Sequence, residues 1–142
     1  MITVDLDKLQ LFEVWVNEDP SVRVRAAYPF PISHATGAKS SAVIYFHVLP
    51  GHRLGRHTDS AEETVFIKSG SGEAVVGNER APVSAGQMVL APAGVPHDFI
   101  NTGPEPLDCV GFYSSAVVFT VFDLPIQPMN VRLGGTPPPQ VS

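Results

Sequence analysis

Residues 86–101 read GQMVLAPAGVPHDFIN, and this stretch decides the fold. Two prolines, Pro92 and Pro96, stiffen the approach to His97 because a proline ring fixes the backbone angle φ. From His97 onward, alternate side chains share one face of a strand, which puts His97 and Asn101 on the same side. The stretch therefore predicts a short β-strand whose first side chain is an imidazole held by a rigid turn.

A second stretch, residues 51–70, reads GHRLGRHTDSAEETVFIKSG. His57 and Asp59 are two residues apart and point the same way on a strand. Glu63 follows a bend and begins the next strand, where it is expected as a cross-strand neighbour of His57. Together with His97, these side chains supply the imidazole nitrogens and carboxylate oxygens that bind divalent transition metals. The sequence thus predicts one metal site built on facing strands.

The 14 prolines and 12 glycines divide the chain into short segments. The spacing of apolar residues that is typical of an amphipathic helix is found only weakly, in a turn around residues 5–12. Short segments bounded by turn residues predict an all-β sandwich or barrel of antiparallel strands. The expected strands are residues 22–27, 42–49, 64–68, 73–76, 87–90, 98–101, 107–113 and 116–122.

The length of 142 residues fits one domain, and 44% hydrophobic residues are enough to form a core. A formal net charge of -5 repels phosphate groups, so neither nucleic acid nor a membrane surface is an expected partner. Cys109 is the single cysteine, which excludes an intrachain disulfide. The first residues, MITVDLDKLQ, lack the features of a secretory signal, so we expect a cytoplasmic protein.

The two polar stretches resemble the paired motifs of the cupin superfamily. The second motif, G-x5-P-x-G-x2-H-x3-N, is matched at Gly86, Pro92, Gly94, His97 and Asn101. The first motif, G-x5-H-x-H-x3,4-E-x6-G, is matched at Gly51, His57, Glu63 and Gly70. Asp59 stands where the family usually has its second histidine. The resemblance implies a double-stranded β-helix, also called a jelly-roll barrel, which we expect to span residues 41–123.

The segments outside the barrel are residues 1–40, an N-terminal extension that contains the alternating run SVRVRAAYPF, and residues 124–142, which end in a flexible, proline-rich tail. Small cupins often pair such an N-terminal strand with a second subunit, so the resemblance implies a homodimer. Phe12, Val14 and Trp15 would supply apolar area either to that interface or to the core. The sequence leaves both uses open.

Asp59 creates two alternatives for the metal site. As a ligand, it completes two imidazoles and two carboxylates, whose charge of about -2 balances a divalent ion and favours Fe(II) or Mn(II) over copper. As a non-ligand, it leaves His57, Glu63 and His97 as a triad of two histidines and one carboxylate, with Asp59 beside it as a general base. Both alternatives favour Fe(II), while manganese, nickel and zinc stay open.

Candidate catalytic side chains are Asp59, Tyr113 and His47. His47 would donate protons if it lined the pocket, although the apolar pattern of its strand favours an outward position. Arg53 and Arg56 flank the first motif and would either bind an anionic substrate or be solvated.

The resemblance and the donor residues together predict a metal-dependent enzyme that acts on a small organic molecule. The leading expectation is a non-haem Fe(II) oxygenase or dioxygenase. The alternatives are a metal-dependent isomerase, cyclase, lyase or decarboxylase, and a barrel that binds a small ligand without turnover.

Overall fold

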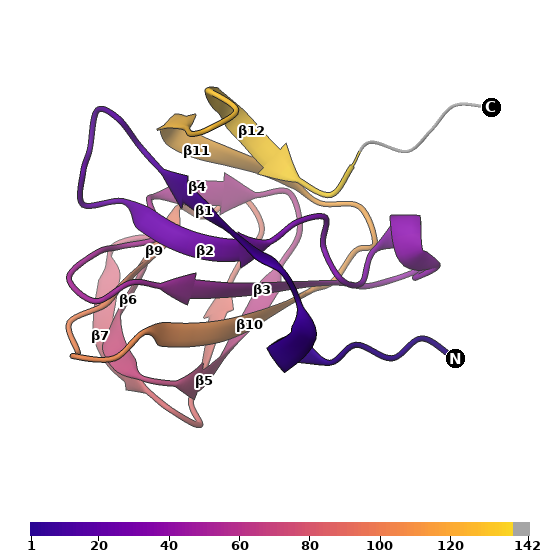
Figure 1. The fold of residues 1–142 in the computed structure, drawn as a ribbon, viewed down its shortest axis with the longest axis horizontal. Coiled ribbons are helices and arrows are strands. Elements are labelled where there is room, and N and C mark those ends of the chain that lie inside the picture. Colours follow the sequence, from indigo (N-terminus) through magenta and orange to yellow (C-terminus); the bar gives the residue numbers. More distant parts are fainter. Residues whose placement is uncertain (138–142) are drawn as a thin grey trace.

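The computed structural model describes residues 1–137, which form two antiparallel sheets of six strands each. The sheets pack against each other around a shared core, and the predicted all-β fold is confirmed (Figure 1). The end of the expected flexible tail, residues 138–142, lies outside the described residues.

The first sheet has the order β1-β2-β3-β10-β5-β8. Its strands are β1 (Leu11–Trp15), β2 (Arg23–Ala27), β3 (Ala42–Val48), β10 (Leu107–Tyr113), β5 (Glu63–Ser69) and β8 (Met88–Ala91). In this sheet β2 pairs with β1 on one side and with β3 on the other. Residues of the N-terminal extension therefore add two strands to the sheet of their own chain.

The second sheet has the order β12-β11-β4-β9-β6-β7. Its strands are β12 (Val131–Gly135), β11 (Phe119–Ile126), β4 (His57–Asp59), β9 (His97–Ile100), β6 (Ser71–Val76) and β7 (Glu79–Ser84). The short strand β4 lies between β11 and β9, so its side chains are supported from both sides.

Seven of the eight expected strands are confirmed, with ends that shift by at most two residues. The expected strand 116–122 is displaced and begins at Phe119. The cause is a turn in which the hydroxyl of Ser115 both accepts from the N–H and donates to the carbonyl of Val117. A side chain that bonds its own backbone in this way competes with strand pairing.

Four of the twelve strands are not among the expected strands: β1, β4, β7 and β12. Of these, β4 is the short strand on which His57 and Asp59 were expected to share a face. Pro82 lies within β7, where it is tolerated because β7 is an edge strand and its outer N–H positions need no partner. The predicted helical turn is present as a 3-10 helix, η1 (Leu6–Lys8), capped by the side chain of Asp5. The chain then becomes extended at Leu11, inside the segment 5–12 that was expected to be helical.

The main core lies between the sheets. From the first sheet, Phe46, Val65 and Ile67 point inward, and Phe99 of the second sheet meets Phe46 with ring centroids 6.3 Å apart. Burial of such side chains contributes about 2 kcal/mol each to the free energy of unfolding. Cys109 is part of this core. The packing fixes the separation of the sheets and with it every distance between side chains on facing strands.

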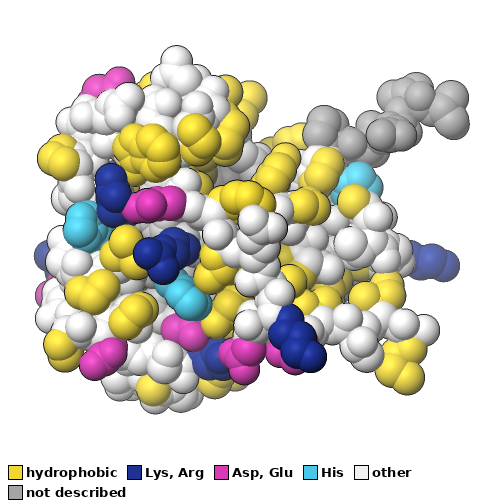
Figure 2. Space-filling view, in the orientation of Figure 1, with side chains coloured by type: hydrophobic (Ala, Val, Ile, Leu, Met, Phe, Trp, Pro, Cys, Tyr) yellow, Lys and Arg dark blue, Asp and Glu magenta, His cyan; other side chains and the backbone are white. Residues whose placement is uncertain are grey.

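Hydrophobic side chains are also exposed on the face shown in Figure 2, beside charged side chains of both signs. Among the described residues, no helix is both long and apolar enough to cross a membrane.

Candidate metal centre

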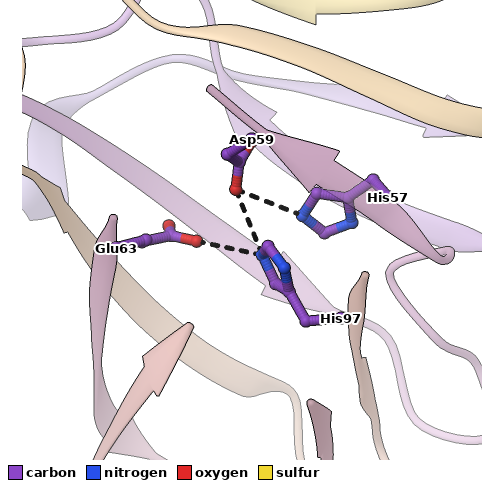
Figure 3. A group of neighbouring side chains, drawn as sticks. All are labelled: His57, Asp59, Glu63 and His97. Carbon is purple, nitrogen blue, oxygen red and sulfur yellow. Dashed lines mark ion pairs between the residues drawn. The ribbon is translucent and has the colours of Figure 1, made fainter. Parts of the chain in front are cut away.

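Four of the predicted site residues, His57, Asp59, Glu63 and His97, converge on one point between the sheets (Figure 3). Each offers one donor atom, and these atoms all lie within 4.8 Å of one another. At most 4% of any of the four residues is exposed to solvent. A buried cluster of two imidazoles and two carboxylates needs a positive charge to be stable.

The strand pairing explains why these residues meet. His57 and Asp59 are at the two ends of β4, with both side chains on its inner face, and His57 lies directly opposite His97 of β9. Glu63 comes from the first sheet, where it begins β5. Its side chain lies on the same inward face of β5 as Val65. The cluster therefore joins three donors of one sheet to one donor of the other.

Backbone carbonyl groups hold both imidazoles in the tautomer that suits a metal. The Nδ1–H of His57 donates to the carbonyl of Gly55 at 2.7 Å, and the Nδ1–H of His97 donates to the carbonyl of Val95 at 2.9 Å. Because Nδ1 donates to the backbone in each ring, Nε2 is the ring atom that faces the cluster and would present its lone pair to a bound metal. Metal-binding histidines characteristically donate their other ring N–H in this way.

Two buried atoms of the cluster, Oδ2 of Asp59 and Nε2 of His97, have no hydrogen-bond partner outside the cluster. They lie 3.1 Å apart, and Nε2 of His97 is also 3.3 Å from Oε1 of Glu63. Nε2 of His57 completes the group at 3.8 Å from Oδ2 of Asp59. A divalent cation satisfies all these lone pairs at once, so the residues present fit the metal that the donor pattern predicted.

The pKa values of the two histidines diverge in the metal-free site. Burial and the nearby charge of His97 lower the pKa of His57 to about 4. Burial also acts to lower the pKa of His97, but the carboxylates of Asp59 and Glu63 outweigh it and raise the value to about 10. The metal-free cluster thus holds a proton on His97, which is the positive charge that a bound metal would replace.

Two residues of β10 shape the surroundings of Glu63. Burial and the carboxylate of Glu63 raise the pKa of Tyr113 well above its usual value, so its hydroxyl stays protonated. Gly111 leaves the space that the Glu63 side chain occupies, since a Cβ there would lie 2.0 Å from Oε2 of Glu63. Tyr113 was a candidate from the sequence, whereas Gly111 was not; a glycine inside the apolar run 107–113 was the available signal.

Arg53 supports the site through ion pairs with two carboxylates of its own chain, and its expected role in binding an anionic substrate stays a prediction. Its guanidinium donates to Oδ2 of Asp98 at 2.7 Å and also binds Asp19. Oδ1 of Asp98 in turn accepts from the N–H of Gly55, the residue whose carbonyl holds His57. This chain of contacts fixes the backbone just before β4.

His47 lies away from the cluster. It is on the face of β3 opposite the inward-facing Phe46, and its Nε2 is 3.0 Å from the hydroxyl of Tyr45, which donates to Asp108. Strand alternation accounts for this placement, because residues 46 and 48 face the core. His47 therefore does not line this cluster, and the catalytic roles of Asp59 and Tyr113 stay predictions.

Comparison with known proteins identifies the family. Residues 44–113 match the family described as the cupin domain, a range that includes all four donors. The chain belongs to the cupin superfamily. No curated protein sequence matches this cupin significantly.

Solved structures share the cupin fold at low sequence identity. A putative sugar phosphate isomerase from Acidithiobacillus ferrooxidans is 19% identical, with a TM-score of 0.64 over 85% of this chain and 80% of that chain. The polyketide cyclase RemF from Streptomyces resistomycificus is 19% identical, with a TM-score of 0.63 over 80% and 78%. A predicted oxalate decarboxylase from Thermotoga maritima is 20% identical, with a TM-score of 0.66 over 80% and 98%.

The asparagine of the second cupin motif has a structural role here. Asn101 is buried, and its Nδ2 donates to the carbonyl groups of Val48 and Glu105. Its Oδ1 accepts from the N–H of Gly103. Asn101 therefore ties the end of β9 to β3 and to the turn that follows, which keeps His97 in place at the other end of the strand.

Proposed function

We propose that this cupin is a metal-dependent enzyme that acts on a small organic molecule. One divalent transition metal would be held by His57, Asp59, Glu63 and His97. The observation that carries the proposal is the buried group of four donor atoms within 4.8 Å of one another, in which Oδ2 of Asp59 and Nε2 of His97 face each other at 3.1 Å and have no partner outside the cluster. Buried polar atoms are rarely left in this arrangement unless an ion or ligand satisfies them.

The charge of the donor set supports manganese or iron as the metal. Two neutral imidazoles and two carboxylates carry about -2 and balance a divalent ion, and carboxylate oxygen donors favour harder ions. A structural neighbour, the Bacillus subtilis oxalate decarboxylase, is described as having Mn(II) centres; it is 20% identical over 77% of this chain and 30% of that chain, with a TM-score of 0.63.

When bound, the metal would supply Lewis acidity that polarises an oxygen of the substrate. The protein supplies the rest. Its four donors are fewer than the six that Mn(II) and Fe(II) ions commonly take, so coordination positions would remain for a substrate. Tyr113 keeps the proton of its hydroxyl beside Glu63, so it would serve as a hydrogen-bond donor that orients Glu63 or a substrate oxygen. The buried position of the cluster excludes bulk water and strengthens these electrostatic interactions.

The reaction that we favour is a proton-transfer or carbon–carbon bond reaction without net oxidation, in the class of isomerases, cyclases and decarboxylases. The structural neighbours with these activities support this choice. An oxygenase is the second candidate. It is favoured by the presence of two imidazoles and carboxylates in one cluster, the donors of non-haem iron oxygenases.

The test begins with elemental analysis of protein that has been purified without chelator. We expect about one manganese or iron ion per chain and a loss of binding in His97→Ala, because that change removes one of two imidazoles. The Mn(II)-loaded protein is then assayed anaerobically against small carboxylic acids, sugar phosphates and diketones. Turnover under these conditions supports the favoured class, whereas turnover that requires Fe(II) and consumes dioxygen supports the oxygenase. A wild type that takes up no metal overturns the proposal. The homodimer and the cytoplasmic location stay predictions.

A further inference from the structure

Thr120 lies beside Asp59, the residue at the position where cupins usually have a second histidine. It lies on β11 directly opposite Asp59 of β4, and its hydroxyl donates to Oδ1 of Asp59 at 2.6 Å. Both residues are buried, with 6% and 2% of their surface exposed. The hydrogen bond is therefore shielded from competing water, and a short bond to an ionised acceptor is among the stronger ones in proteins.

Because of this hydrogen bond, the two oxygens of the Asp59 carboxylate have different surroundings. Oδ1 is occupied by the hydroxyl of Thr120, while Oδ2 has no hydrogen-bond partner outside the cluster and faces Nε2 of His97. A free carboxylate can rotate about its terminal bond and present both oxygens to an ion. Here that rotation would break the Thr120 bond and leave the hydroxyl buried without an acceptor, which is costly.

The surrounding sequence indicates that the hydroxyl is not required by the strand itself. Residues 116–122 read AVVFTVF, so Thr120 is the single polar residue in an apolar run. Valine has nearly the same shape as threonine and an equal preference for strands, so a valine would satisfy the strand at this position. What distinguishes threonine is its ability to donate to Asp59.

We propose that Thr120 is a positioning residue that makes Asp59 a one-oxygen metal ligand. This inference rests on the proposed metal site and adds the reason why an aspartate functions at a position where cupins usually have a histidine. An imidazole has a single donor atom facing the ion, and Thr120 gives the aspartate the same property by occupying its second oxygen.

The experiment compares Thr120→Val, which removes the hydroxyl, with Thr120→Ser, which keeps it. The control is Thr58→Val, which makes the same threonine-to-valine change on β4, on the face of that strand opposite to the side chain of Asp59. Each metal-free protein is titrated with Mn(II), and electron paramagnetic resonance measures the free ion and the spectrum of the bound ion. We expect Thr120→Val to bind Mn(II) 10- to 100-fold more weakly and with an altered bound spectrum, as for other changes to groups that orient a ligand. Thr120→Ser and Thr58→Val should stay within about threefold of the wild type.

A second readout separates positioning from packing. In an Asp59→His background, Thr120→Val should leave the affinity for Zn(II) unchanged, because position 59 then has no carboxylate for Thr120 to orient. A loss there would show that Thr120 acts through packing and would overturn the inference. Circular dichroism checks that each variant is folded; if Thr120→Val does not fold, Thr120→Ala, which also lacks the hydroxyl, replaces it.

The outcomes distinguish this inference from the proposed function. Wild-type affinity and an unchanged spectrum in Thr120→Val would overturn the inference alone, because the site would still bind metal. A wild type that binds no Mn(II), Fe(II) or Zn(II) would overturn the proposed function and the inference with it. Weak binding in Thr120→Val, restored in Thr120→Ser, supports both.

Discussion

Gly111 of β10 is the position where a single methyl group should damage the metal centre. In Gly111→Ala, the new Cβ would lie 2.0 Å from Oε2 of Glu63 and 2.8 Å from Cγ2 of Ile44. Nonbonded heavy atoms settle at about 3.5 Å, so the carboxylate of Glu63 must retreat by roughly 1.5 Å. Metal–donor distances tolerate changes of only about 0.2 Å, which means that Glu63 would cease to be a ligand without further rearrangement.

The expected result is a large loss of metal affinity with a smaller loss of stability. Displacing one of four donors should weaken Mn(II) binding by about 10- to 100-fold or more. The loss of a group that only orients a metal ligand already weakens binding by this factor. Overpacking against Glu63 and Ile44 should lower the free energy of unfolding of the metal-free protein by about 1–3 kcal/mol. Mn(II) titration followed by electron paramagnetic resonance measures the first effect, and urea unfolding measures the second.

Gly134→Ala is the matched control, since a Cβ at this strand position meets nothing closer than 3.6 Å. It should change neither quantity by more than about 0.5 kcal/mol. A double-mutant cycle with Glu63→Ala isolates the cause: the stability cost of Gly111→Ala should fall in that background to the part due to Ile44. Wild-type Mn(II) affinity in Gly111→Ala would refute the reasoning, because it would mean that Glu63 does not need the space above Gly111.

Three further predictions concern the ligand set, an ion pair and the assembly. Asp59→His should raise the affinity for copper and nickel relative to manganese, measured by competitive loading, and an unchanged preference would show that Asp59 is not a ligand. Hydrogen bonds from Ser21 and Arg53 lower the pKa of Asp19 to about 2, from 3.8, so these bonds stabilise the fold above about pH 4 and their contribution is lost as the pH falls towards 2. Asp19→Asn should therefore cost about 1 kcal/mol in urea unfolding at pH 6 and much less at pH 2.5, and an equal cost at both pH values would contradict the assignment. The predicted homodimer has an apolar surface available on the outer face of the first sheet, where Phe112, Leu90 and Met88 are exposed by 48%, 55% and 69%; Leu90→Glu should yield monomers in sedimentation equilibrium, and a monomeric wild type would disprove the dimer.

The donors of the site could be predicted because their arrangement is encoded locally. His57 and Asp59 share a face through the two-residue period of a strand, and turn residues mark where the strands that carry Glu63 and His97 begin. These local patterns place each donor on its strand, whereas the expectation that His97 meets the other three was supported by the resemblance to the paired cupin motifs. The same reasoning recovered seven of the eight expected strands, because those segments are apolar and bounded by glycine or proline.

The supporting residues could not be predicted in the same way. Thr120 is 61 positions from Asp59 in the chain, and Gly111 is 48 positions from Glu63. Their roles depend on strand order and register, which single-sequence patterns do not determine. His47 shows the converse error: its residue type suits catalysis, but the alternation of β3 turns it away from the cluster. Residue type indicates which side chains could belong to the site, and strand pairing determines which of these side chains lie together.

The position of Glu63 explains why core and site depend on each other in this fold. Three donors belong to the second sheet, and Glu63 alone comes from the first. Its distance to the others is therefore set by the separation of the sheets, which packing such as that of Phe46 against Phe99 maintains. A bound metal would join the two sheets and stabilise the folded state in proportion to the logarithm of the metal concentration. Substitutions in the distant core should for the same reason weaken metal binding as well as stability.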